Sequence, residues 1–138
     1  MQSFIWMNIK LVLKMCIKGD PRTKKNSMRI IIGWTSDGKP YPRPIPSKAF
    51  SEYEEVFLWQ IKKSQKLKID FPVNIKCVYY MKTRRKVDLL NLLGATMDIL
   101  VSGGVLKDDN SSIVVSHDGS RVLYDKENPR VEIEIERI

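Results

Sequence analysis

The segment 73–104 constrains the fold more than any other part of this chain. Every second residue from 73 to 81 is apolar, which is the period of a strand with one buried face. A basic segment, 82–86, follows at once. Asp88 then stands at the N-cap of a helix whose apolar residues recur at helical spacing over 89–100, and a pair of glycines predicts its end. The sequence therefore predicts a sheet strand followed directly by a capped helix.

Two further stretches alternate in the same way and predict strands at 9–17 and 131–135. Ser47 is the expected N-cap of a second helix, which carries aromatic residues at helical spacing and runs to about position 64. We interpret these rings as core residues rather than as a platform for base stacking: Phe50, Tyr53 and Phe57.

The remaining segments carry turn signals. A Ser-Asp-Gly run at 36–38 and four prolines within 40–46 predict turns and irregular, extended backbone at the surface over 36–46. An Asp-Gly pair at 118–119 lies between two short apolar runs and predicts a β-hairpin of 113–116 with 121–124. The order of elements indicates an α+β or mixed α/β domain. We expect the α+β class, with a single mixed sheet and helices packed on it, in one domain over 1–138 of which 1–8 are an extension.

Charge is divided unevenly along the chain. Residues 1–86 hold 19 Lys and Arg against 6 Asp and Glu, whereas residues 87–138 hold 5 against 10. A basic surface favours a polyanion because binding releases condensed counterions, so nucleic acid is the first partner to consider. The alternative is that a net charge of +8 only keeps a small domain in solution.

The two cysteines and the apolar N-terminal stretch bear on the cellular compartment. Cys16 and Cys77 lie far apart and have no histidine nearby, which supports neither a thiolate metal site nor a disulfide framework. We expect both to be buried, reduced thiols in a cytoplasmic protein. Lysines interrupt the N-terminal apolar stretch, so we expect a strand there and no membrane segment.

Acidic residues at both ends of the expected helix are candidate metal ligands. Mg²⁺ prefers oxygen ligands and is commonly held by one or two carboxylates together with substrate phosphates. Asp88, Asp108 and Asp109 could supply them, and a metal held there could polarise a phosphodiester and help to deprotonate a water molecule. Each acid also has a plain structural alternative: Asp88 as a helix cap, and Asp108 and Asp109 with Asn110 as a polar turn.

The run from Arg84 to Asp109 resembles the signature of the RusA family of Holliday-junction resolvases. That family has a basic stretch, Asp-Leu-Asp-Asn-Leu opening a helix, an Asp within the helix, and an Asp-Asp pair after a glycine turn. Here Arg84 to Leu92, Asp98 and Gly104 to Asp109 match it in order and spacing. The resemblance implies a RusA-like fold and a homodimeric endonuclease, often carried by bacteriophages or prophages, that uses Mg²⁺ or Mn²⁺ to cut four-way DNA junctions in recombination and repair.

Carried over by position, the resemblance makes Asp88 and Asp109 catalytic metal ligands, with Asp108 beside Asp109 and Asn91 as the asparagine of the motif. Basic side chains near these acids are the expected phosphate contacts, which position DNA without reading its sequence. The alternative for the two lysines of this set is a solvated loop. The set is Arg22, Lys24, Lys25, Arg84, Arg85 and Lys86.

Two positions depart from the family's pattern. Leu90 stands where the family has a second catalytic aspartate, and Gly94 stands where it has a catalytic lysine. One explanation is an active subfamily whose site is completed by another residue, for which Asn91, Asp98 and Asp118 are candidates. The other is a protein that binds branched DNA and cleaves it weakly or not at all.

The length of the expected helix limits how the acids can meet. A helix over 89–101 is about 20 Å long, and the six residues from 102 to 107 span at most about 20 Å when extended. Either the helix ends early, or Asp108 and Asp109 approach Asp88 of a second subunit. A dimer suits a four-way junction, which has two equivalent cleavage positions.

Overall fold

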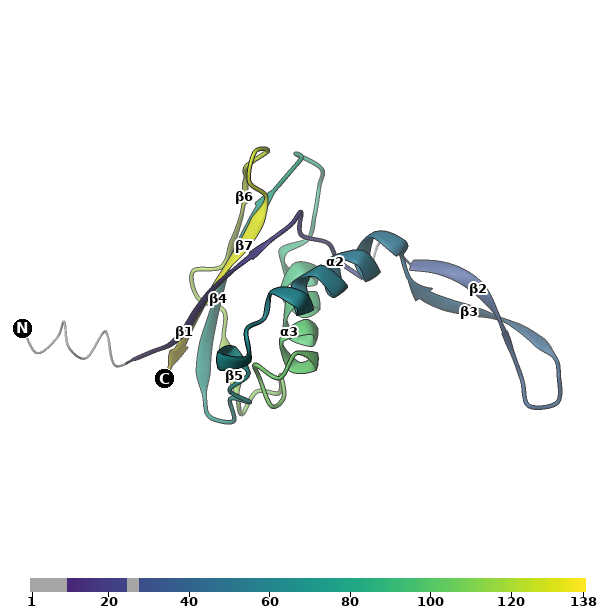
Figure 1. Ribbon diagram of the computed structural model, residues 1–138, viewed down its shortest axis with the longest axis horizontal. Helices are drawn as coiled ribbons and strands as arrows, with labels where there is room; N and C mark the ends of the chain where they lie inside the picture. The colour runs from purple at the N-terminus through teal and green to yellow at the C-terminus, as the bar shows by residue number, and fades with distance from the viewer. Residues whose placement is uncertain (1–9, 25–27) are drawn as a thin grey trace, which may run out of the picture.

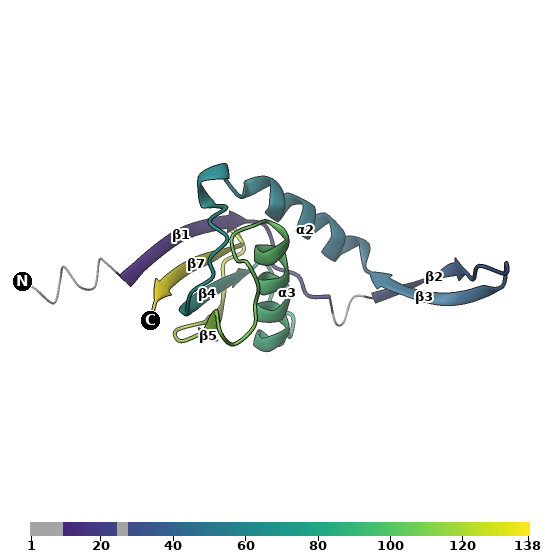
Figure 2. The same cartoon turned by 90° about the horizontal axis from the view of Figure 1, so that it is seen from below.

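The structure is a computed structural model that describes residues 10–24 and 28–138. The expected extension at 1–8 and the candidate Lys25 lie outside the described residues. A five-stranded mixed sheet carries α2 (Lys48–Gln60) and α3 (Leu89–Ser102) on one face, and a two-stranded ribbon projects from this body (Figures 1 and 2). The α+β class, with helices packed on a mixed sheet, is therefore confirmed. The ribbon is a second, small sheet that was not expected.

The strand order of the main sheet brings distant segments together. Its order is β1, β7, β4, and then β5 and β6 one after the other along the free edge of β4. β7 is antiparallel to both β1 and β4, so β1 and β4 run in the same direction and end at the same edge. We call this edge the carboxyl edge. The strands are β1 (Leu11–Lys18), β4 (Val73–Met81), β5 (Val114–Ser116), β6 (Arg121–Tyr124) and β7 (Arg130–Arg137).

The predicted hairpin around Asp118 and Gly119 is wrong. β5 and β6 do not pair with each other; both pair with β4 in the parallel sense, as two parts of one interrupted strand. The turn between them is held from the β4 side, because Oδ1 of Asn74 accepts the Asp118 N–H at 2.8 Å and the Cys77 N–H donates to Ser120 Oγ at 3.0 Å. The Asp-Gly pair thus makes a local detour and does not reverse the chain.

The expected turn and extended, exposed backbone over 36–46 are present, but the prediction that this segment is irregular is wrong. β2 (Met28–Trp34) and β3 (Pro40–Pro46) form a regular antiparallel ribbon closed by a turn at 35–39. The four prolines of β3 occupy every second position, so their missing N–H groups all fall on one side of the strand. The opposite side remains free to pair with β2.

The core lies between the main sheet and the two helices. Ser47 caps α2, as expected, by accepting the Phe50 N–H at 3.1 Å, and both Phe50 and Phe57 are buried. Tyr79 of β4 reaches α3, where its hydroxyl lies 2.7 Å from Thr96 Oγ1. The prediction that both cysteines are buried is wrong for Cys16, which is exposed because it shares the outward face of β1.

Within the described residues, neither α2 nor α3 is long and apolar enough to cross a membrane.

Candidate functional site

A β-α-β crossover places the candidate acids at opposite edges of the sheet. β4 ends at the carboxyl edge, α3 runs back across the face, and β5 starts beside the beginning of β4, with Val114 opposite Val73. Leu106 lies beside Ile69, just before β4 begins. The 14 residues of α3 make its ends about 20 Å apart. Asp88 therefore lies at the carboxyl edge, and the segment 107–110 lies at the other edge.

Asp88 acts as the N-cap of α3. Its Oδ1 accepts the Leu90 N–H at 2.8 Å, which satisfies one of the free donors at the start of the helix. The side chain is exposed. Within residues 10–24 and 28–138, no hydrogen-bond donor contacts Oδ2. The predicted N-cap role of Asp88 is thus confirmed, and its role as a metal ligand stays a prediction.

Asp108 organises a tight polar turn. Its Oδ1 accepts the Asp109 N–H at 2.8 Å and its Oδ2 accepts Nδ2 of Asn110 at 3.0 Å. These hydrogen bonds hold the pKa of Asp108 below its usual range, and the bond from the Asp109 backbone has the largest effect. Asn110 in turn accepts the Ser112 N–H at 2.9 Å. The turn leaves Asp109 exposed beside an ionised neighbour, so the segment presents negative charge to solvent.

The substitutes considered for the missing ligand do not gather around Asp88. Asp98 lies two turns after Asn91 on α3, and its carboxylate pairs with Lys24 at 3.2 Å. Asp118 lies beside Asn74, on the sheet face opposite α3. Asn91, half-buried in the first turn of α3, is the one candidate next to Asp88 in the chain.

No group of three or more His, Cys, Asp or Glu side chains that could hold a metal ion occurs within the part of the chain that is described. The residues of one chain therefore do not fit the expected metal site. The first of the two geometric alternatives is wrong as well, because α3 continues to Ser102 and does not end early. The second alternative, acids contributed by two subunits, stays a prediction.

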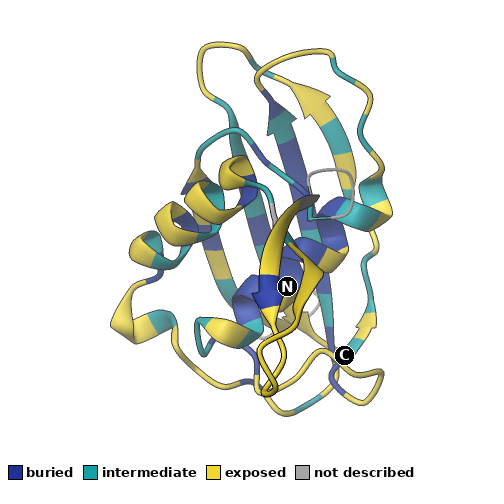
Figure 3. Cartoon of the chain, turned by 90° about the vertical axis from the view of Figure 1, so that its right-hand side faces the viewer, coloured by how far each residue is buried: buried dark blue, intermediate teal, exposed yellow. Residues whose placement is uncertain are grey.

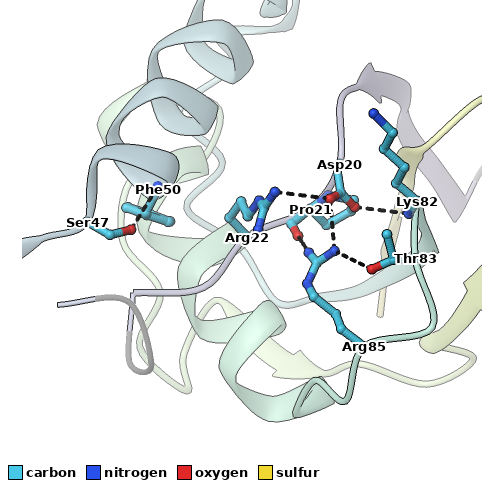
Figure 4. A network of polar contacts seen from close by, with 8 residues as sticks. All are labelled: Asp20, Pro21, Arg22, Ser47, Phe50, Lys82, Thr83 and Arg85. Atoms are coloured by element: carbon cyan, nitrogen blue, oxygen red, sulfur yellow. Dashed lines mark hydrogen bonds and ion pairs between the residues drawn. The ribbon is translucent and has the colours of Figure 1, made fainter.

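Asp20 joins two loops at the carboxyl edge, where β1 and β4 both end. Its carboxylate accepts the Lys82 N–H at 3.0 Å and Nη1 of Arg85 at 2.8 Å, and Arg22 approaches it to 3.3 Å (Figure 4). Nη2 of Arg85 also donates to the Pro21 carbonyl at 2.6 Å. The Asp20 side chain is only 13% exposed. These contacts fix the basic loop 82–86 against the segment that follows β1.

The other cations of this edge are more accessible. Arg84 is exposed and stacks its guanidinium 4.2 Å from the centre of the Tyr124 ring, a geometry that leaves its N–H groups in solvent. Lys86 is exposed directly before the cap of α3. Lys24 is bound to Asp98 and lies 5.7 Å from the Phe50 ring centre. Among the expected phosphate contacts that the structure describes, Arg84 and Lys86 are the exposed cations next to Asp88.

Sequence reasoning missed Asp20. It stands between Gly19 and Pro21 in a segment that gave only a turn signal, and its hydrogen-bond partners Lys82 and Arg85 lie more than 60 positions further along the chain. The signal that could have found it is a carboxylate directly after a strand, at an edge shared with a basic loop. That signal becomes informative only when β1 and β4 are known to be parallel.

The positions lost relative to the family's pattern both lie on the solvent side of α3. Leu90 is 75% exposed in the first turn of α3. Gly94 is exposed, and a Cβ added there would meet no atom within 4 Å. Neither substitution is therefore required by the packing of this domain.

Comparison with known proteins identifies the family. A search of curated proteins finds no match to this chain. The family model described as endodeoxyribonuclease RusA matches residues 19–136, which include β2 to β6, all but the last residue of β7, both helices and every candidate acid. The chain belongs to the RusA family of endodeoxyribonucleases.

Proposed function

We propose that this protein is a homodimeric endonuclease that cleaves four-way DNA junctions with the help of Mg²⁺ or Mn²⁺. Each of its two sites would combine Asp88 of one subunit with Asp108 and Asp109 of the other. The observation that carries the proposal is the placement of these acids at opposite edges of the sheet in a chain of a nuclease family. A twofold pairing that sets the carboxyl edge of one subunit against the opposite edge of its mate would unite them.

The charge near Asp88 supports a phosphate backbone as the substrate. Arg84 and Lys86 are exposed within four residues of Asp88, and Asp20 holds their loop in place. Cations at such positions bind phosphates and set the register of the duplex. A divalent metal, when bound by the acids, would supply Lewis-acid stabilisation of the phosphate charge. The residues of the chain would bind and orient the scissile strand beside it.

The test of activity uses a labelled synthetic four-way junction, a fork and a plain duplex, each with Mg²⁺, Mn²⁺ or a chelator. We expect paired cuts in the junction that need a metal and that disappear in Asp88→Asn and in Asp109→Asn. Equal cutting of the duplex would contradict junction selectivity. Cutting that persists in the chelator would contradict the need for a metal.

A mixing experiment tests whether the site is shared. Asp88→Asn and Asp109→Asn chains are unfolded together and refolded, so that half of the dimers are mixed. In a shared site, one of the two sites of a mixed dimer keeps both Asp88 and Asp109, and nicking of one junction strand returns. If each site lies within one chain, every site lacks an acid and the mixture stays inactive.

The second candidate function is a branched-DNA-binding protein with little or no cleavage. The observation that favours it is Leu90, an exposed leucine at the place of a family aspartate. Leu90→Asp separates the two, with Leu90→Asn as the uncharged control. If the wild-type protein binds junctions without nicking them and only Leu90→Asp gains metal-dependent nicking, the binding protein is the correct description.

A further inference from the structure

The ribbon of β2 and β3 stands apart from the rest of the protein. Its strands pair in register from Met28 opposite Pro46 to Trp34 opposite Pro40, and a turn at 35–39 closes it. It extends away from the sheet and helices (Figures 1 and 2) and is coloured almost entirely as exposed in Figure 3. No residue of 30–45 belongs to the buried core cluster of the described chain. A role in holding the fold together therefore does not explain the ribbon.

One face of the ribbon is an uncovered apolar stripe. Alternation along β2 puts Ile30, Ile32 and Trp34 on the same face, and these side chains are 66%, 66% and 65% exposed. Their partners across the ladder are all prolines: Pro44, Pro42 and Pro40. Contiguous exposed apolar surface on a soluble domain commonly marks a binding site.

The prolines of β3 argue against the addition of another strand at that edge of the ribbon. Prolines at every second position leave that edge without the N–H donors that an added strand would need. A second copy of this chain could therefore not extend the ribbon there.

Charge points to a polyanion instead. Asp37, the acidic residue of the ribbon turn, contacts Lys39 at 3.9 Å and also contacts the Thr35 hydroxyl. Arg43 is exposed on β3, on the face opposite the apolar stripe. Residues 28–46 hold three basic residues against one acidic residue, so the ribbon complements an anion better than a second ribbon of the same charge, and DNA offers both phosphates and apolar base faces.

We infer that the ribbon is a wedge that enters branched DNA, with Ile32 and Trp34 against the bases that flank the branch point and Arg43 near a phosphate. This inference rests on the proposed DNA substrate. Apolar side chains inserted between base steps unstack and kink DNA, and aromatic rings stack on exposed bases. Seven residues in each strand make a ribbon about 20 Å long, which exceeds the depth of a DNA groove, about 8 Å.

The test uses the full chain carrying Asp88→Asn, so that DNA stays intact, and a four-way junction with 2-aminopurine at the branch point. Fluorescence of 2-aminopurine rises when the base unstacks. We expect the protein to raise it without any added metal. Replacing Ile30, Ile32 and Trp34 by Thr, which keeps strand propensity, should remove the rise and weaken junction binding about 10-fold or more while duplex binding changes less than twofold. Trp34→Phe should keep most of the rise.

The matched control is Trp59→Thr, which removes a tryptophan that is 82% exposed on α2. It should behave like the parent protein. A triple variant that still raises the signal, or that loses duplex and junction binding equally, would overturn the inference. So would a triple variant with a changed monomer–dimer equilibrium in sedimentation without DNA, because the stripe would then be a subunit contact. Failure of metal-dependent cutting with an intact fluorescence response would remove the proposed nuclease and leave the wedge.

Discussion

Replacement of Asp20 by Asn tests whether this carboxylate positions the basic loop. The side chain is 13% exposed and accepts hydrogen bonds from the Lys82 backbone and from Arg85. Hydrogen bonds to a charged group contribute about 1.5–3 kcal/mol each to the free energy of unfolding. The Asn side chain keeps one acceptor oxygen, but its N–H₂ group replaces the second acceptor and faces another donor. The Arg85 side chain is 30% exposed and can be partly rehydrated. We therefore expect the free energy of unfolding to fall by about 2 kcal/mol, near the low end of this range.

That loss converts into a measurable shift of the melting temperature. Unfolding entropy of about 2.1 cal/mol/K per residue gives about 0.3 kcal/mol/K for this chain, so 2 kcal/mol corresponds to about 7 °C. Thermal melts and urea denaturation at neutral pH measure both quantities. Asp70→Asn is the control, because it removes the same charge from an exposed position and should change the free energy of unfolding by less than about 0.5 kcal/mol. Equal effects of the two substitutions would refute the reasoning.

DNA binding is a second test of the same substitution, because the two explanations predict opposite changes in DNA affinity. If the carboxyl edge bound DNA only through its net charge, loss of a negative charge at Asp20 would tighten binding to every DNA. If Asp20 positions Arg84 and Lys86 for phosphates, junction binding should weaken although the protein becomes more basic. Filter binding or fluorescence anisotropy at two salt concentrations separates the two, and tighter binding in Asp20→Asn would contradict the positioning role.

Three further predictions follow from local geometry. Gly94→Lys should raise the free energy of unfolding in urea by about 0.7 kcal/mol, because glycine is a poor helix former and the site has room; a decrease would show hidden crowding. Native protein should react with one equivalent of a thiol reagent and denatured protein with two, since Cys16 is exposed whereas burial raises the pKa of Cys77 to about 12 and keeps it a neutral thiol at pH 7–9. Tyr79→Phe should cost about 1 kcal/mol through loss of its contact with Thr96, and a change below about 0.3 kcal/mol would speak against that hydrogen bond.

Elements with a strong local pattern could be predicted from the sequence. β4 has an apolar, buried residue at every second position, α3 has a capping aspartate and a glycine end, and α2 has Ser47 at its start. The ribbon was missed because the four prolines of β3 normally count against a strand. Pairing with β2 is possible only because the prolines occupy alternate positions, which puts their missing N–H groups on the same side of the strand. The parallel pairing of β5 and β6 with β4 depends on a long-range partner, which short-range turn signals do not reveal.

The candidate site divides in the same way. The acids, the basic loop and the two departures from the family's pattern lie within one continuous motif, so they could be identified without coordinates. Their distribution in space could not, because it follows from the crossover and from the direction of β5 relative to β4. Asp20 escaped notice for the same reason, since its contacts with Lys82 and Arg85 exist only when β1 and β4 end at one edge.

The crossover has a consequence for how such a protein would be controlled. On the proposed pairing, a monomer carries two half-sites, neither of which is complete, and it has no nuclease activity. Below the dissociation constant of the pair, the rate of strand scission would then grow with the square of the protein concentration. Dilution alone would therefore stop cleavage, and DNA would be cut only after the protein had accumulated to a concentration at which dimers form.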